Sequence, residues 1–245
     1  MVRHVDSRER ESEILSLIVE NYIEQSKPIS SAYLCQHCRL NYSSATVRNV
    51  MLALEKQGFL SHIHTSSGRV PTKQGFKRYV EDFDEETISR NFPISLDPYS
   101  PAEYGIDDIV DHTLDSLAQF SGYTSLVAIS GRNERMSYKG MRFIMEQPEF
   151  EDVRRLKGIF YVLEVKMDML QSLLFDCIDE KVKILIGDDI GLEEISNCSL
   201  VVSGLRKEHF SFALALLGPM RMDYAKAVSC LHSAKNQLDE VAEEF

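Results

Sequence analysis

The sequence lacks the features that would place the chain in a membrane or in an oxidising compartment. No apolar run approaches the roughly 20 residues that a membrane-spanning helix needs. Residues 1–13 are charged throughout and contain no apolar region of the kind found in signal peptides. The five cysteines are an odd number and do not have the spacing of a disulfide framework. These absences predict a cytoplasmic protein without membrane contact.

Motifs for catalysis and for cofactor binding are also missing. There is no glycine-rich phosphate loop, no His-x-x-Glu-His pattern and no readable Ser/His/Asp arrangement. Cys35 and Cys38 have the spacing of two zinc ligands, and three histidines lie nearby, but no second cysteine pair follows. Both cysteines fall within a predicted helix, where we expect them to be core thiols. The sequence therefore predicts that the chain is not an enzyme and holds no metal or cofactor.

The chain has room for two modest domains. It contains 245 residues, of which 44% are hydrophobic, which suffices for packed cores and is too many for a disordered chain. Three prolines interrupt the stretch between residues 93 and 101, which has little periodicity of either kind. We therefore predict a first domain over residues 1–83, a linker over 84–102 and a second domain over 103–245.

The first domain shows the pattern of a helix-turn-helix. An amphipathic helix is predicted over residues 7–25, before Pro28. Serines at 30 and 31 can cap a short second helix, and Ser43-Ser44 can cap a longer one over residues 45–57. Gly58 can adopt a positive φ angle and end that helix.

A β-hairpin is predicted directly after the longer helix. Residues 59–63 alternate between apolar and polar types, as a half-buried strand does, and residues 64–69 form a hydroxyl-rich turn. Thr72 follows and can cap a further helix over residues 73–82. A hairpin in this position with an arginine near its tip is typical of the wing in a winged-helix DNA-binding domain.

The polar face of the longer helix and the hairpin form the candidate DNA-binding site. Arginine pairs best with guanine and asparagine with adenine in the major groove, and recognition helices use their N-terminal residues for this. Between residues 30 and 80 there are seven basic residues and one acidic residue, a net charge of +6 in a chain of net charge −11. The predicted site residues are Ser44, Thr46, Arg48 and Asn49 on the helix, and His64, Thr65, Ser66, Arg69 and Lys73 at the hairpin. We expect Arg48 and Asn49 to read bases, and the hairpin residues to hold the DNA backbone.

Two other interpretations of this domain remain open, because short helix-turn-helix patterns also occur in proteins that do not bind DNA. The basic face could be the adaptor surface of a protein-interaction module. Alternatively, the chain could be a ligand-sensing protein in which a small molecule controls DNA binding. Salt-dependent DNA binding, or its absence, separates the first alternative from a repressor, and thermal stabilisation by a metabolite would indicate the second.

The second domain has the pattern of an α+β fold. A helix over residues 106–120 has apolar residues near a seven-residue repeat, so it could pack against a partner chain or form part of an ordinary core. The other predicted elements are a strand at 123–130, a turn at 131–135, a long helix at 149–178, strands at 182–186, 200–205 and 212–217, and a last helix at 223–240.

Several blocks of this sequence together resemble the HrcA family of heat-inducible transcription repressors. They keep their order along nearly the whole chain and form a specific set. The blocks are SATVRN at residues 44–49, Leu54-Glu55 with Gly58, HTSSGRVPT at 64–72, GFKRYV at 75–80, EQPEF at 146–150 and GPMRMDY at 218–224.

The resemblance implies a dimeric repressor that binds an inverted-repeat operator upstream of chaperone genes, with the chaperonin as a positive modulator. It also implies a winged helix joined to a GAF-like domain that carries an inserted dimerising domain. Here only nine residues lie between Ser130 and Gly140, where the family carries a long segment, and the family's Ile-Gly-Glu-Glu-Asn block is altered at 186–190. We therefore expect an N-terminal winged helix-turn-helix plus a reduced GAF-like α+β domain. A homodimer would then use helix 106–120, helix 149–178 or the remaining sheet face.

Overall fold

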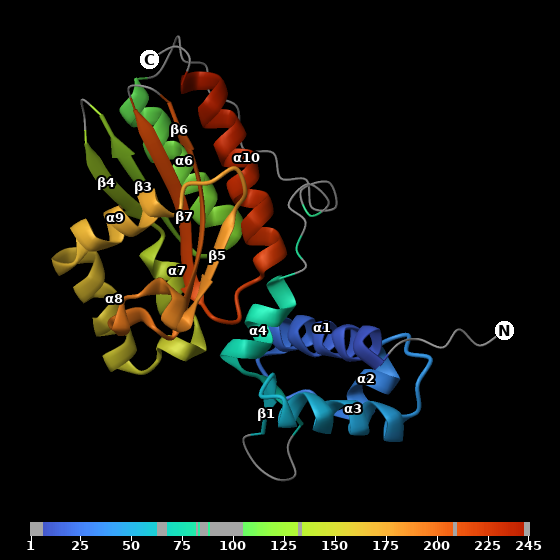
Figure 1. Cartoon of the computed structure of the whole chain (residues 1–245). Helices are drawn as coiled ribbons and strands as arrows, with labels where there is room; N and C mark the ends of the chain where they lie inside the picture. The colour runs from blue at the N-terminus through green and yellow to red at the C-terminus, as the bar shows by residue number, and fades with distance from the viewer. Residues whose placement is uncertain are drawn as a thin grey trace. The chain divides into compact units, whose positions relative to one another are not determined.

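The computed structural model describes residues 7–62, 68–81, 83, 88, 105–131, 134–207 and 210–242 (Figure 1). The chain divides into two compact units, residues 1–83 and 84–245. No helix among the described residues is both long enough and apolar enough to cross a membrane. Helices and a five-stranded sheet together make the chain an α+β protein.

The first unit contains the three helices predicted before Gly58, followed by a short hairpin and a fourth helix. Their order is α1 (Ser7–Gln25), α2 (Ser31–His37), α3 (Ser44–Lys56), β1 (Leu60–Ser61), β2 (Val70–Pro71) and α4 (Lys73–Val80). Strand β1 is shorter than the predicted strand over residues 59–63. Residues 63–67 lie outside the described part of the chain.

Hydroxyl caps define where three of these helices begin, as the sequence predicts. The Ser30 hydroxyl accepts from the Tyr33 N–H at 3.1 Å, and the Ser43 hydroxyl accepts from the Thr46 N–H at the same distance. The Thr72 hydroxyl accepts from the Gly75 N–H in the first turn of α4, also at 3.1 Å. Each cap satisfies an N–H group that lacks a partner within the helix. At the other end of α3, Gly58 has a φ of +85°.

The core of the first unit forms where α1 packs against α3 and α4. Ile14 and Ile18 of α1 and Val47 of α3 are fully buried, and Leu54 is 2% exposed. Burying one such side chain contributes about 1.5–3 kcal/mol, so this apolar contact fixes which face of α3 points inward.

A close approach between distant backbone segments completes the first unit. Strands β1 and β2 pair antiparallel, and Ile29 pairs with Arg69 beside them. The Ile29 N–H donates to the Arg69 carbonyl at 2.9 Å, and the Arg69 N–H donates to the Ile29 carbonyl at 2.7 Å. A Cβ atom on Gly68 would lie 2.3 Å from the Ile29 carbonyl oxygen, so only glycine fits there.

The second unit is built around an antiparallel sheet with the strand order β4-β3-β7-β6-β5. Its strands are β3 (Thr124–Ser130), β4 (Arg135–Lys139), β5 (Lys183–Ile186), β6 (Cys198–Arg206) and β7 (Ser211–Pro219). From residue 105 onward, the described α-helices are α6 (Ile106–Ser121), α7 (Met141–Met145), α8 (Val153–Val165), α9 (Met167–Asp176) and α10 (Tyr224–Ala242). The 3-10 turns Pro148–Phe150, Gly187–Ile190 and Glu193–Ile195 lie in the described connections.

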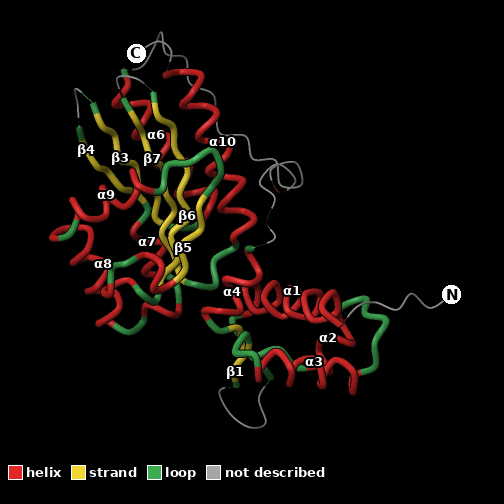
Figure 2. The backbone as a smooth tube through the Cα atoms, viewed as in Figure 1, coloured by secondary structure: helices red, strands yellow, loops and turns green. Residues whose placement is uncertain are grey.

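Helices cover both faces of this sheet (Figure 2). On one face lie α6 and α10, and the Ser125 hydroxyl of β3 donates to the Leu114 carbonyl of α6 at 2.7 Å. On the other face Leu126 packs in a large apolar cluster with residues of α8 and α9, including Ile159 and Leu170. Successive residues of β3 therefore point to opposite helical layers, as the pleat of a strand requires.

Two predictions about the second unit are wrong. The long helix over residues 149–178 is interrupted twice. Asp152 is extended and caps α8 after a 3-10 turn, and Lys166 leaves the helical conformation, with φ −108° and ψ 23°, between α8 and α9. The strand β4 was not predicted, and the turn expected over residues 131–135 leads into it. It is a five-residue edge strand that alternates: Met136 and Tyr138 pack against the apolar cluster, whereas the end cations, Arg135 and Lys139, pair with aspartates of α6.

Helix α6 belongs to the core of its own unit. Leu114 and Leu117 are fully buried and Ile109 is 1% exposed, whereas Phe120 at its end is 44% exposed. Most of the apolar stripe that could have served a partner chain is thus already covered by the sheet and α10.

Candidate nucleic-acid interface

Helix α3 has one buried face and one exposed face. Val47, Met51 and Leu54 point into the core. With 3.6 residues per turn, the side chains that share the opposite face are three or four residues apart. The exposed residues on that face are Ala45, Arg48, Asn49 and Leu52, preceded by the exposed Ser44 at the start of the helix.

Arg48 and Asn49 are available to an external partner. Both are exposed, and within the described part of the chain neither side chain makes a hydrogen bond or an ion pair. A guanidinium with five donors and an amide that can both donate and accept thus stand side by side near the N-terminal end of α3.

Thr46 has a different environment from its neighbours. Its side chain is half-buried, and its hydroxyl lies 2.9 Å from the Ser43 hydroxyl, whose oxygen also accepts from the Thr46 N–H. The Thr46 hydroxyl is therefore engaged in the N-cap of α3, whereas the exposed Ser44 side chain points to solvent.

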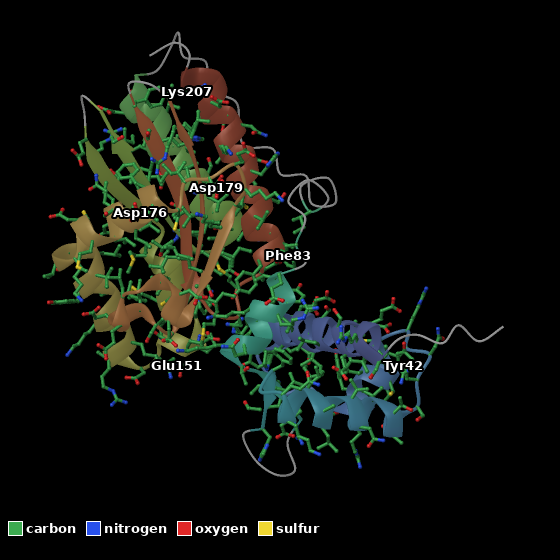
Figure 3. All side chains as sticks on the ribbon, in the orientation of Figure 1. Tyr42, Phe83, Glu151, Asp176, Asp179 and Lys207 are labelled. Carbon is green, nitrogen blue, oxygen red and sulfur yellow. The ribbon has the colours of Figure 1, made fainter. Side chains whose placement is uncertain are left out.

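The connection between α2 and α3 is fixed to α1 through Tyr42, which Figure 3 labels. The Tyr42 hydroxyl donates to the Glu13 carboxylate at 3.0 Å, and the Arg10 guanidinium lies 5.2 Å from the centre of the Tyr42 ring. These contacts hold the segment that leads into the N-terminus of α3. The exposed Arg39 lies on the same connection.

Glu55, near the C-terminal end of α3, joins this helix to the hairpin. Its carboxylate accepts from the Arg69 Nε at 2.9 Å and also binds His62 through Nδ1. The hydrogen bond with His62 is the largest cause that holds the pKa of Glu55 below its ordinary value; burial opposes it, and the nearby Arg69 guanidinium lowers the pKa further. Glu55 is the acidic residue of the otherwise basic stretch between residues 30 and 80.

The predicted hairpin residues are only partly described. His64, Thr65 and Ser66 lie outside the described residues, so their contact with DNA stays a prediction. Arg69 is 19% exposed and bound to Glu55, and Lys73 is half-buried at the start of α4. Since His62 and Arg69 flank residues 63–67 and both bind Glu55, the two ends of that stretch are attached to α3.

Sequence reasoning did not identify Glu55 or Gly68 as part of this site. For Glu55 a signal was present, because a single carboxylate among seven basic residues is a natural ion-pair partner. Gly68 needs its backbone approach to Ile29, 39 positions earlier in the sequence, which no local pattern shows.

The second unit contains an open pocket of about 390 Å³ between α6 and α7. Its charged groups already have partners: the Asp115 carboxylate lies 3.8 Å from Lys139 Nζ, and the Arg142 guanidinium lies 4.7 Å from the centre of the Phe143 ring. The pocket is lined by Asp115, Ala118, Gln119, Gly140, Met141, Arg142 and Phe143. It offers no converging set of free polar groups that would favour a specific ligand.

Comparison with known proteins gives a consistent result along the chain. Residues 127–228 match the family model described as HrcA protein C terminal domain. A heat-inducible transcription repressor HrcA from Bacillus pumilus is 22% identical, with 92% of this chain and 95% of the relative covered. The repressor HrcA of Chlorobium phaeobacteroides is 31% identical over 205 residues, which cover 78% of this chain and 56% of the relative.

The similarity is stronger in part of the chain, and it extends to a solved structure. A repressor HrcA from Roseiflexus castenholzii is 46% identical over 82 residues, 34% of this chain and 23% of that one. A structure described as the crystal structure of a hypothetical protein superimposes with a TM-score of 0.76 at 17% identity, covering 98% of both chains, which shows a shared fold.

These relatives define the class of the protein as a transcription repressor. The chain belongs to the HrcA family, whose curated members are heat-inducible repressors. It is a short member. The alignment with the Bacillus pumilus relative spans 327 positions, whereas 92% of this chain is about 225 residues, so about one hundred positions of the relative have no counterpart here.

Proposed function

We propose that this repressor of heat-shock genes binds double-stranded operator DNA through a winged helix-turn-helix in residues 7–83. Helices α2 and α3 form the helix-turn-helix, and the hairpin of β1 and β2 forms the wing. The observation that carries the proposal is the pair Arg48 and Asn49, exposed and without internal partners among the described residues on the outer face of α3.

The chemistry of α3 suits base reading. Arg48 can donate two hydrogen bonds to the N7 and O6 atoms of guanine, and Asn49 can pair with the N6 and N7 atoms of adenine. Each such bidentate contact contributes about 1–3 kcal/mol of discrimination against the wrong base. Ser44 stands at the helix N-terminus, where free N–H groups and the helix dipole favour a phosphate.

Contacts to the DNA backbone would come from the residues around α3. The exposed Arg39 precedes the helix and the exposed Lys56 ends it. His64, Thr65, Ser66, Arg69 and Lys73 would hold the backbone from the wing, with Thr46 supporting the helix start. Neutralising phosphates releases counterions, so binding through these residues should weaken steeply as salt increases.

Two copies of the winged helix-turn-helix are needed for a specific and tight complex with DNA. A homodimer would place its two α3 helices in successive major grooves, about 34 Å apart, and would therefore require an inverted repeat. The second unit would be a reduced GAF-like domain, which its five-stranded antiparallel sheet between two helical layers supports. The repressor would act in the cytoplasm, and control by a chaperonin stays a prediction from the family resemblance.

A selection experiment tests this proposal and identifies the operator at the same time. The full chain is mixed with a pool of random DNA duplexes, bound DNA is amplified over several rounds, and the enriched sequences are read. We expect an inverted repeat that shifts in a gel far more readily than a scrambled duplex, with binding lost as salt rises.

Two outcomes would contradict the proposal. Equal affinity for selected and scrambled duplexes would show that α3 does not read sequence. An absence of salt-dependent DNA binding, together with capture of a protein by the basic face, would support the adaptor interpretation instead.

A further inference from the structure

Helix α8 carries an exposed apolar row on the outside of the second unit. Residues four apart lie on neighbouring turns of one helix face, and its inward residues Ile159, Val162 and Leu163 are fully buried in the core. The exposed apolar residues of this surface are Val153 (60%), Tyr161 (46%) and Val165 (63%) of α8, together with Met169 (55%) at the start of α9. We call this set the α8–α9 face.

This face differs from the other exposed apolar residues of the described chain. Leu52, Phe120 and Met145 stand singly on α3, α6 and α7. Single exposed apolar residues are normal on a protein surface, whereas several gathered on neighbouring turns favour an interaction site. On α8 the row also includes the exposed Lys157, between Val153 and Tyr161. Four of the seven large exposed apolar side chains in the described residues lie on these two successive helices, so the α8–α9 face is a candidate docking surface.

The charges along α8 are arranged for an antiparallel partner. Its N-terminal half carries Arg154, Arg155 and Lys157, and its C-terminal end carries Glu164, all exposed. After the N-cap Asp152, this order is the reverse of the one that the helix dipole favours, with cations near the N-terminus and an anion near the C-terminus. Within its own chain Arg154 pairs with the N-cap Asp152, with Nη2 3.1 Å from the carboxylate, so it would bridge Asp152 and a partner carboxylate. Within the described residues, Lys157 and Glu164 make no ion pair.

We propose that a second copy of this chain docks on the α8–α9 face, with the two α8 helices antiparallel about a two-fold axis. The register that sets Val153 opposite the partner's Val165 also sets Arg154 opposite the partner's Glu164. The same register places Lys157 beside the partner's Tyr161, where a cation can lie over an aromatic ring. A two-fold interface repeats each of these contacts, so this one surface is complementary to itself.

The geometry predicts a dimer of moderate strength. Thirteen residues of α8 extend over about 20 Å, so two such helices with their flanking residues form an interface at the low end of the usual size range. The dimer should therefore dissociate on dilution. The inference rests on the proposed function, which requires two copies of the winged helix-turn-helix, but the docking surface can be tested without DNA.

Sedimentation of the full chain over a wide range of concentrations tests the surface. We expect a monomer–dimer equilibrium whose dissociation constant rises at least about tenfold in Val165→Glu, because the new carboxylate loses its water opposite an apolar side chain. Phe120→Glu, at an exposed apolar site on the opposite helical layer, is the matched control and should leave the equilibrium unchanged. Circular dichroism checks that both variants are folded.

A charge exchange tests the register. Arg154→Glu and Glu164→Arg should each weaken the dimer, since each places like charges opposite one another. The double variant should recover much of the lost affinity, because both symmetric pairs are restored with opposite polarity. A double variant no tighter than either single variant would overturn the register.

The proposal fails if the unmodified chain is a monomer at every concentration, or if Val165→Glu forms dimers as tightly as the unmodified chain. Gel shifts with the selected duplex distinguish this failure from failure of the proposed function. If Val165→Glu forms dimers as tightly as the unmodified chain and both prefer the selected duplex, only the α8–α9 face is refuted. If the unmodified chain shows no preference for the selected duplex, the proposed DNA-binding function is refuted, whether the chain is a monomer or a dimer.

Discussion

The Glu55 carboxylate lies 2.9 Å from both the Nε and the Nη2 of Arg69, so the helix that carries Arg48 also holds the hairpin that follows it. His62 binds the other carboxylate oxygen. One acidic residue thus connects α3 to both ends of residues 63–67. We expect the position of the β1–β2 hairpin to depend on this carboxylate more than on any single residue of the hairpin.

Replacing Glu55 by Gln tests this connection through its pH dependence. The pKa of Glu55 is lowered in the folded protein, so its stabilisation is present above the ordinary glutamate pKa of about 4.3 and is lost as pH falls through the folded value. Melting temperatures measured from neutral to acid pH should show this loss in the unmodified chain and a smaller one in Glu55→Gln.

Glu81→Gln is the matched control for that measurement, because Glu81 pairs with Arg78 on the surface and such pairs contribute little. Its pH profile should follow that of the unmodified chain. Coinciding profiles for Glu55→Gln and the unmodified chain would show that the carboxylate does not stabilise the domain.

Gly68→Ala should destabilise the first unit. The added Cβ would lie 2.3 Å from the Ile29 carbonyl oxygen, so the paired hydrogen bonds between Ile29 and Arg69 must move. We expect a loss of about 1–3 kcal/mol in the free energy of unfolding, measured in urea, together with weaker DNA binding. Gly105→Ala, whose Cβ would meet nothing nearer than 3.7 Å, should cost less, because its effect is limited to a poorer N-cap of α6. Equal stability of both variants would contradict the close approach.

Arg221→Lys tests the contact that joins two of the family-like blocks. The Arg221 guanidinium binds both oxygens of Glu149 and also donates to Gln147 at 2.9 Å, linking residues 218–224 to residues 146–150. A lysine ammonium cannot reproduce this planar fork, so we expect unfolding to become easier by about 1–3 kcal/mol. The same change at the more exposed Arg78 should cost well below that amount. Comparable losses at the two positions would contradict a special role for Arg221.

Tyr123→Phe should alter stability at alkaline pH. Burial raises the pKa of Tyr123 to about 12, and its oxygen accepts from the Asp223 N–H at 2.7 Å. A raised pKa in the folded state gives a stabilisation that is complete below the ordinary tyrosine value of about 10 and is lost as pH rises towards 12.

Urea unfolding near neutral pH and at alkaline pH would check this expectation. At neutral pH, Tyr123→Phe should have a free energy of unfolding about 1–2 kcal/mol below that of the unmodified chain, because the Asp223 N–H loses its acceptor. Between neutral and alkaline pH, the free energy of unfolding should fall less in Tyr123→Phe than in the unmodified chain. Tyr138→Phe is a control, because the Tyr138 hydroxyl makes no hydrogen bond within the described residues. An unchanged alkaline profile in Tyr123→Phe would contradict the buried ionisation.

The first unit was largely predictable because its signals are local. Ser30, Ser43 and Thr72 each cap the helix that follows them, and Gly58 takes the positive φ that ends α3. The outward position of Arg48 follows from the helical period once the buried stripe is known.

The errors in the second unit have tertiary causes. The apolar spacing continues across Lys166 without a glycine or proline, so the break between α8 and α9 leaves no local signal. Strand β4 carries a local alternation, with Met136 and Tyr138 towards the apolar cluster, but it is only five residues long and depends on pairing with β3 and on ion pairs to α6. In the site itself, the contact between Glu55 and Arg69 joins residues 14 positions apart and required the folded backbone to be recognised.

The most direct test of the account is the ratio of dissociation constants for scrambled and selected duplexes, measured by fluorescence anisotropy at one salt concentration. Arg48→Ala should lower this ratio by a factor that corresponds to about 1–3 kcal/mol, because a base contact is lost. Arg39→Ala, which removes an exposed cation before α3, should weaken both complexes alike and leave the ratio unchanged. A ratio that is the same for Arg48→Ala and the unmodified chain would contradict sequence reading by α3.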